Sequence, residues 1–344
     1  MSQKAHHVGE TAPMIEMTIG DKLEEIAAAN PYHPALIMPH QDIRWSYEEF
    51  NGQVDRFAAG LIHMGIEKGD RVGIWSPNRV EWVLTQFATA KIGAIMVCVN
   101  PAYRLFELEY VLNKVGCKAL VTAEIFKTSS YLDMLNELAP ELSDCAPGAL
   151  KSQKFPHLTT VIRMGDGKSP GMYNFDNVMD MGTESDAKAA KAVARTLHAN
   201  DNINIQFTSG TTGTPKGATL SHRNILNNAF LSARSMRLTS VDRLCIPVPL
   251  YHCFGMVLGT LLCVSVGATM VSPGEVFEPE QTLRMASEEK CTALHGVPTM
   301  FIAQLDLPNF KDFDVGPLRT GIIAGSTCPV ELMNRMIKDM ELTE

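Results

Sequence analysis

The chain has 344 residues, of which 45% are hydrophobic and 20% are charged, with a formal net charge of −8 and a sequence pI near 5.7. This length predicts about two domains or lobes with a large core. The acidic balance argues against a general nucleic-acid binder, although a local basic pocket could still hold an anion.

The composition of residues 1–17 predicts a flexible tail. They contain neither the apolar stretch of a signal peptide nor an Arg-rich amphipathic helix, so a secretory or mitochondrial leader does not fit. The eight cysteines form no C-x-x-C pair, and several lie in apolar runs, as Cys98 and Cys263 do. We interpret them as buried free thiols in a reducing compartment, and we expect a cytoplasmic protein.

Short apolar runs alternate with longer helical runs along most of the chain. A capping box, formed by Ser46 and Glu49, opens one of the helices. The repeated units predict an α/β fold with mostly parallel sheets covered by helices. We expect helices over 21–29, 46–64, 79–91, 105–115, 128–138, 223–237, 254–266, 280–289, 299–305 and 329–340. We expect strands over 71–75, 94–99, 119–122, 158–163, 203–207, 218–220, 243–247, 269–272, 293–297 and 320–324.

Residues 139–202 interrupt this alternation, because they are rich in Pro, Gly, Ser and Asp. We predict a loop-rich connection there, between lobes at about 18–138 and 203–344. The uncharged stretch 254–271 includes a G-x-x-x-G pattern that is also found in membrane helices. Gly267 ends a helix there well short of the roughly 20 residues that span a bilayer, so we expect a buried helix followed by a buried strand.

The sequence TSGTTGTPKG, residues 208–217, predicts a loop that binds the phosphates of ATP. Its glycines let backbone N–H groups approach an anion, and Lys216 adds a charge for the β- and γ-phosphates. It is not a Walker A loop, because Gly217 stands where that pattern has a Mg²⁺-binding Ser or Thr, so such a hydroxyl would come from earlier in the loop. The candidate ATP contacts are Thr208, Ser209, Gly210, Thr211, Thr212, Gly213, Thr214, Pro215 and Lys216.

This loop and the residues that follow it, ATLSHRN, resemble the signature of the AMP-forming acyl-adenylating enzymes, which include acyl-CoA synthetases, luciferases and the adenylation domains of peptide synthetases. The stretches PLYHCFG (249–255), GVPT (296–299) and AGS (324–326) are similar to further motifs of that family. Within it, NPAY, ELEY and PGALKS, which begin at residues 100, 107 and 147, look like medium-chain fatty acyl-CoA synthetases of the family-member-2 type. The resemblance covers residues 18–344.

The resemblance implies a two-step reaction on a fatty acid, ATP and coenzyme A, with Mg²⁺ as cofactor. A carboxylate attacks the α-phosphorus of ATP, which gives an acyl-adenylate and pyrophosphate, and the thiol of coenzyme A then displaces AMP. It also implies a large N-terminal domain with two related lobes. The chain ends at Glu344 before the family's Y-G-x-T-E motif and C-terminal domain. We therefore expect a truncated chain that is nearly inactive in adenylation and retains weak ATP binding.

Carried over position by position, the resemblance implies catalytic roles for Lys216 and His252. Thr208 matches a hydroxyl near Mg²⁺, and His252 matches a histidine near the α-phosphate and the acyl carboxylate. Gly325 and Ser326 match a stretch that lines the adenine and acyl sites. For His295 a structural role stays open beside a role in the acyl pocket. The residues expected along the acyl and coenzyme A channel are Cys253, Phe254, His295 and Gly296.

Two other functions stay open. One is an adenylating enzyme that delivers its acyl group to a carrier protein or another acceptor, and the other is a non-catalytic nucleotide-binding fragment. A preference for medium or longer fatty acids is our hypothesis, because pocket depth depends on tertiary packing. The sequence also leaves the oligomeric state open, a homodimer included.

Overall fold

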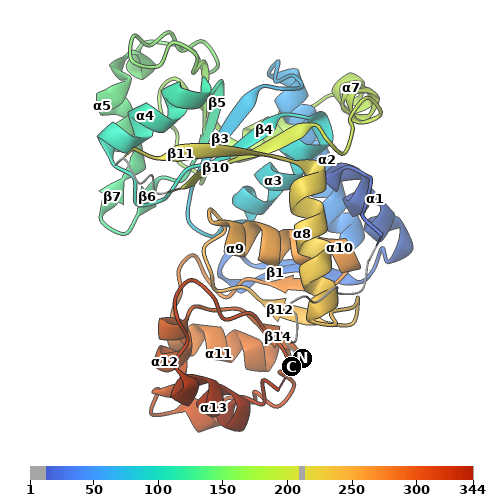
Figure 1. Ribbon diagram of the computed structural model, residues 1–344. Helices are drawn as coiled ribbons and strands as arrows, with labels where there is room; N and C mark the ends of the chain where they lie inside the picture. Colours follow the sequence, from blue (N-terminus) through green and yellow to red (C-terminus); the bar gives the residue numbers. More distant parts are fainter. Residues whose placement is uncertain (1–12, 209–213, 344) are drawn as a thin grey trace, which may run out of the picture.

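The structure is a computed structural model that describes residues 13–208 and 214–343. Two separate sheets, one of seven and one of five strands, form its main layers (Figure 1). The seven-stranded sheet has the order β11-β10-β4-β3-β5-β8-β9, and every neighbouring pair is parallel except β10 and β11. Its strands are β3 (Arg71–Trp75), β4 (Ile95–Cys98), β5 (Ala119–Thr122), β8 (Thr160–Arg163), β9 (Met172–Asn174), β10 (Asn202–Thr208) and β11 (Lys216–Ser221).

The five-stranded sheet has the order β14-β12-β13-β1-β2, and only β1 and β2 are antiparallel. The prediction of mostly parallel sheets is thus confirmed for both sheets. Our sequence analysis did not predict β1, which begins at Pro34 and is followed by Pro39, or β2, which has only four residues. The strands are β1 (Pro34–Met38), β2 (Ile43–Ser46), β12 (Arg243–Cys245), β13 (Thr269–Val271) and β14 (Ala293–Leu294), and a small hairpin adds β6 (Ile125–Phe126) and β7 (Ser129–Ser130).

Each sheet combines segments from both parts of the predicted division. Strands β10 and β11 follow residues 139–202 in the chain, yet they pair with β4. Strands β1 and β2 precede that region, yet β1 pairs with β13. The two layers therefore do not coincide with successive lobes at 18–138 and 203–344.

Helices fill the space between the sheets and cover their outer faces (Figure 1). Helix α3 lies between the layers, and all of its 13 residues are buried, as expected of a helix with neighbours on every side. Helices α11, α12 and α13 cover the far side of the five-stranded sheet (Figure 1). The helices are α1 (Ile19–Ala29), α2 (Tyr47–His63), α3 (Val80–Ile92), α4 (Leu105–Val115), α5 (Tyr131–Leu138), α6 (Phe175–Met181), α7 (Glu184–Ala194), α8 (His222–Ser235), α9 (Cys253–Gly255), α10 (Leu262–Val266), α11 (Pro279–Glu288), α12 (Pro298–Leu305) and α13 (Val330–Asp339). Shorter helical turns are η1 (Pro39–Gln41), η2 (Pro140–Ser143), η3 (Met256–Leu261) and η4 (Phe310–Asp312).

The capping box that we predicted at the start of α2 is present. The hydroxyl of Ser46 accepts a hydrogen bond from the backbone N–H of Glu49, and the Glu49 carboxylate accepts one from the backbone N–H of Ser46. A second capping box, formed by Thr183 and Asp186, opens α7 inside the predicted loop-rich connection. That region also contains β8, where the sequence predicts a strand over 158–163, and α6 and β9, which the sequence did not predict.

Two other elements differ from the prediction. The segment expected as a strand over 320–324 makes only isolated bridges, from Thr320 to Ala293 and from Ile323 to Gly296. Gly321 approaches the carbonyl oxygen of Leu294 too closely for a side chain, and a glycine weakens a strand interior. The helix expected over 254–266 is present, but its middle turn, η3, is a π-helix between α9 and α10.

Among the residues that the structure describes, no helix combines the length and hydrophobicity that a membrane-spanning segment requires. The stretch 254–271 is instead the buried helix and buried strand that the sequence predicts. All eight cysteines are free thiols, and five of them are buried.

Candidate functional site

The predicted phosphate loop joins the two strands of an antiparallel hairpin, β10 and β11. Thr208 and Lys216 face each other at the last pair of the ladder, and the Thr208 hydroxyl lies 3.5 Å from the Lys216 carbonyl oxygen. The side chains of Thr208, Thr214 and Lys216 are exposed. The pairing therefore fixes both ends of the loop and leaves their polar groups open to solvent. The predicted contacts Ser209, Gly210, Thr211, Thr212 and Gly213 lie outside the described residues.

A side chain just after Lys216 would pack tightly against the paired strand. A Cβ atom at Gly217 would lie 3.1 Å from the Ile205 side chain and 3.4 Å from the ring of Phe207, both on the paired strand. Half-buried Pro215 precedes Lys216 and makes no backbone N–H bond. The sequence P-K-G thus suits the point where a loop enters an edge strand.

His252 begins the helix that follows the PLYH stretch. Its Nδ1 accepts a hydrogen bond of 3.1 Å from the backbone N–H of Phe254, so the imidazole is the N-cap of α9. A neutral ring that accepts at Nδ1 carries its hydrogen on Nε2, and burial lowers the pKa of His252, which favours this neutral form. The exposed side chain can therefore offer an Nε2–H donor to an oxygen atom of a ligand.

Cys253 lies beside this imidazole, with Sγ 3.7 Å from His252 Nδ1. The Cys253 side chain is exposed, and partial burial raises the pKa of its thiol, so the neutral thiol is favoured. Phe254 turns the other way, and its ring packs on His295 with 5.3 Å between the ring centroids. Of the predicted channel residues, only Cys253 is exposed beside His252.

His295 is fully buried, and both of its ring nitrogens have partners. Nε2 lies 2.7 Å from the carbonyl oxygen of Leu258, and Nδ1 accepts a hydrogen bond of 3.1 Å from the backbone N–H of Ile322. The next residue, Gly296, donates its N–H to the Ile322 carbonyl oxygen. In this structure both residues contact protein groups, which favours the structural role that the sequence left open for His295.

Gly325 and Ser326 lie just after the segment that is bonded to His295. Gly325 has a φ of +92°, in the region that favours glycine, and a Cβ atom there would lie 3.1 Å from Val297. Both residues are exposed, as expected for backbone and hydroxyl groups that face a ligand.

The hairpin and the helix that begins at Cys253 are in contact. Gln206, two residues before Thr208, places its Nε2 3.5 Å from Met256 Sδ and 3.2 Å from Cys98 Sγ. Met256 belongs to the π turn just after His252. Figure 1 shows α9 below the hairpin strands. The structure therefore places the strand that precedes the loop against the helix that follows the PLYH stretch.

Sequence analysis missed a residue that supports this region. Asn78 is buried, and its side chain donates to the Val248 carbonyl oxygen at 3.0 Å and accepts from the Leu250 N–H at 2.8 Å. It thereby holds the segment before His252 in the way that a paired strand would. The available signal was its position three residues after the end of β3, at the carboxyl edge of the sheet, where polar residues of α/β proteins often have functional roles.

A cavity of about 430 Å³ lies beside this segment. Its walls include Tyr251 and also Asn100 and Ala102, which belong to the NPAY stretch. Two motifs that carry the family resemblance thus face the same cavity, although about 150 residues separate them in the chain.

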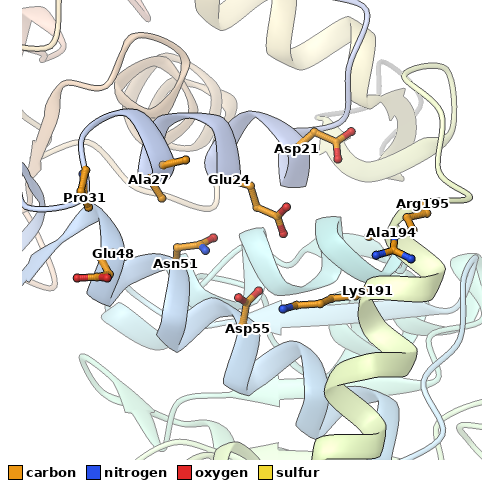
Figure 2. A pocket seen from close by; sticks show the side chains of 11 residues that line it. Asp21, Glu24, Ala27, Pro31, Glu48, Asn51, Asp55, Lys191, Ala194 and Arg195 are labelled. Carbon is orange, nitrogen blue, oxygen red and sulfur yellow. The ribbon is translucent and has the colours of Figure 1, made fainter.

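Another cavity, of about 550 Å³, lies between α1, α2 and α7 (Figure 2). It shares no lining residue with the predicted site. Beside it, the buried ammonium group of Lys91 contacts the carboxylates of Glu24 and Asp55 and the side-chain oxygen of Asn51. The wall residues are therefore partly engaged in a structural ion-pair network. The lining residues are Asp21, Glu24, Ala27, Ala28, Pro31, Glu48, Asn51, Asp55, Lys191, Ala194 and Arg195.

Together the two sheets and their covering helices form an α/β domain of the kind that the sequence predicts. The chain belongs to the family described as AMP-binding enzyme, whose model matches residues 23–343. It is 47% identical over 334 residues to YngI of Bacillus subtilis (strain 168), a provisionally assigned acyl-CoA synthetase, with 97% of this chain and 60% of that protein covered. It is 44% identical over 332 residues to the mitochondrial medium-chain acyl-CoA ligase ACSF2 of Homo sapiens, with 95% of this chain and 54% of that protein covered.

Solved structures support the fold. The anthranilate CoA ligase AuaEII in complex with anthranoyl-AMP superimposes with a TM-score of 0.82 at 22% identity, over 96% of this chain and 59% of that one. The N-terminal domain of FACL13 from Mycobacterium tuberculosis gives a TM-score of 0.78 at 24% identity, over 94% and 73%. The chain spans 54–60% of the length of the curated relatives above, so it corresponds to their N-terminal part.

Proposed function

We propose that this chain carries the ATP- and acyl-binding part of an AMP-forming fatty acyl-CoA synthetase. The observation that carries the proposal is the pairing of Thr208 with Lys216, which sets the two described ends of the TSGTTGTPKG motif opposite each other, with their side chains exposed. Membership in the AMP-binding enzyme family and the names of the relatives point to the same chemistry.

In the proposed reaction, the carboxylate of a fatty acid attacks the α-phosphorus of ATP, and pyrophosphate leaves. Charge spreads over the phosphoryl oxygens in such a step, so positioning and electrostatic stabilisation are the main contributions of the protein. Lys216 and the loop would hold the β- and γ-phosphates, that is, the leaving pyrophosphate. The Nε2–H of His252 would donate to an oxygen of the α-phosphate or of the acyl carboxylate.

Mg²⁺ and coenzyme A complete the proposal. The exposed hydroxyl of Thr208 is of the type that can approach Mg²⁺, a cation that prefers oxygen ligands and usually keeps several waters. Mg²⁺ would neutralise charge on the phosphates of ATP. Exposed Cys253 and buried Phe254 lie at the start of the helix where the acyl and coenzyme A channel is expected. Coenzyme A would then displace AMP from the acyl-adenylate.

The cysteines bear on the cellular location of the protein. Free thiols at all eight cysteines agree with a reducing compartment such as the cytoplasm, which we propose as the location. The ACSF2 relatives are named as mitochondrial proteins. Imaging of a tagged protein in its own cells would decide between the two.

The test is equilibrium binding of ATP to the purified chain, with and without Mg²⁺, followed by ATP–pyrophosphate exchange with carboxylates from acetate to palmitate. We expect ATP binding that Mg²⁺ strengthens, and the highest exchange with medium or longer fatty acids. Because the relatives are longer than this chain, exchange is also measured on a longer form that continues as they do. Exchange with amino acids or aryl acids alone, or no ATP binding by either form, would contradict the proposal.

A further inference from the structure

The helix that starts at Cys253 contains an unusual turn. Residues 256–261 form a π-helix between two α-helical turns. Such turns are rare and leave backbone groups without their usual α-helical partners. Two carbonyl oxygens of this turn accept hydrogen bonds from distant side chains, from Gln86 Nε2 to Met256 at 3.4 Å and from His295 Nε2 to Leu258 at 2.7 Å. Insertion of side chains into a helical ladder is a recognised cause of such irregular turns.

The His295 ring also contacts the segment before Gly325 and Ser326, which is the second wall of the site as we propose it. Its Nδ1 accepts the N–H of Ile322, which lies three residues before Gly325. A single neutral tautomer, with the hydrogen on Nε2, satisfies both bonds, and burial lowers the pKa of His295 to about 4, which keeps the ring neutral. The imidazole is fully buried, and the ring of Phe254 covers it. His295 therefore joins the helix after His252 to the segment before Gly325 and Ser326.

We propose that His295 is a positioning residue, which sets the placement of His252 relative to Gly325 and Ser326 by bonding the π turn and the Ile322 segment at once. The proposal rests on the proposed function, because it assumes that these two walls bind one acyl-adenylate between them. His295 acts through the backbone and does not touch the ligand. A one-residue π insertion changes the helical direction of everything before it, so loss of the Leu258 bond would redirect the turn that carries His252 and Cys253.

The first test needs no ligand. His295→Phe keeps a ring of similar size and removes both hydrogen bonds. Gln86→Leu removes bonds to the π turn only, namely the one that Nε2 donates to the Met256 carbonyl oxygen and the one that Oε1 accepts from the Thr260 hydroxyl. Amide hydrogen exchange should become at least tenfold faster in residues 254–260 and at Ile322 in the first variant, and only in residues 254–260 in the second. Unchanged exchange at Ile322 in His295→Phe would overturn the proposal.

The second test measures binding of two probes by calorimetry, ATP and the non-hydrolysable adenylate analogue octanoyl-sulfamoyl-adenosine, which needs both walls. His295→Phe should weaken binding of the analogue at least tenfold and binding of ATP less than threefold. His295→Gln, whose amide supplies one donor and one acceptor, should recover most of the affinity for the analogue. Equal affinities of the wild type and His295→Phe would overturn the inference alone, whereas a wild type that binds neither probe would contradict the proposed function.

If His295→Phe does not fold, His295→Asn serves as the test of the positioning role. Its short side chain can still accept from Ile322 but does not reach Leu258. Exchange should then quicken in residues 254–260 and stay slow at Ile322, with at least a fivefold loss of affinity for the analogue. Wild-type exchange and affinity in this variant would overturn the proposal.

Discussion

Lys216 lies directly opposite Thr208 in the register of the β10–β11 hairpin, with both side chains exposed. Substitution of an exposed side chain usually changes the free energy of unfolding by about 0.5 kcal/mol or less. Lys216 is therefore a position where ligand binding and stability can be separated by mutation.

We expect Lys216→Ala to weaken ATP binding on the order of tenfold to a hundredfold, because a hydrogen bond to a charged group contributes roughly 1.5–3 kcal/mol. AMP, which lacks the β- and γ-phosphates, should bind with nearly unchanged affinity. Calorimetric titration with both nucleotides measures the difference. Thr219→Ala, at another exposed position of β11, is the matched control, and an equal loss for ATP and AMP would contradict the assigned contact.

His252 has a capping role and a proposed ligand role, which two substitutions can separate. His252→Ala removes the cap and should lower the free energy of unfolding by about 1 kcal/mol, whereas His252→Asn keeps a good N-cap residue and should cost little. Both should weaken binding of an acyl-adenylate analogue, because both remove the imidazole Nε2–H. Urea unfolding and calorimetry provide the two measurements. Full analogue affinity in His252→Asn would rule out the ligand role.

Asn78→Ala should lower the free energy of unfolding by about 2–4 kcal/mol, because it leaves the buried Val248 carbonyl and Leu250 N–H without their partner, and each such group costs roughly 1–3 kcal/mol. Urea unfolding measures the loss. Asn113→Ala is the matched control, since Asn113 makes a single hydrogen bond near the surface, to the Lys154 carbonyl oxygen, and its loss should cost about 1 kcal/mol or less. Equal losses in the free energy of unfolding for the two variants would show that the two Asn78 hydrogen bonds contribute no more than one bond near the surface.

The free energy of unfolding should change with pH partly because of two buried histidines, His222 and His295. Burial lowers the pKa of both His222 and His295 to about 4, from the usual 6.5. For His222 the charges of Asp201 and Asp21 oppose this shift and Lys68 adds to it. Between pH 4 and 6.5 the unfolded chain therefore binds more protons than the folded one, so this stability is complete above pH 6.5 and is lost as the pH falls towards 4.

Urea unfolding at several pH values measures that proton difference. Each histidine contributes about 1.4 kcal/mol of slope per pH unit where its uptake is complete. His295→Gln keeps the hydrogen bonds and removes one titrating group, so it should reduce the slope by close to one proton. A slope identical to that of the wild type would show that His295 does not become protonated on unfolding.

Some elements of this fold are predicted correctly from residues that lie within them or next to them in the chain. The Ser46–Glu49 capping box and the apolar run at β3 depend on neighbouring residues, and both are where the sequence predicts them. The capping box of Thr183 and Asp186, in a segment rich in Ala, carried an equally good signal that the surrounding Pro, Gly and Ser obscured.

The non-local features could not be predicted in this way. The π turn is hydrogen-bonded by Gln86 and His295, which are distant from it in sequence, and nothing within residues 256–261 indicates where those side chains lie. The pairing of β1 with β13 likewise joins positions more than two hundred residues apart. For the candidate site, the sequence predicts the motif residues, which stay a prediction, whereas the hydrogen bonds of Asn78 and the two bonds of His295 became visible only in three dimensions.

The pairing of β1 with β13 also constrains the order of events during synthesis. On the ribosome β1 emerges long before Thr269–Val271. The edge of β1 that pairs with β13 therefore stays unpaired while most of the chain is made. Strands that stay unpaired until a distant partner is made favour slow folding and expose edges that can aggregate. A nascent chain released before about residue 271 would therefore keep an unpaired β1, and chaperone contacts during translation should concentrate on its apolar sequence, PALIM.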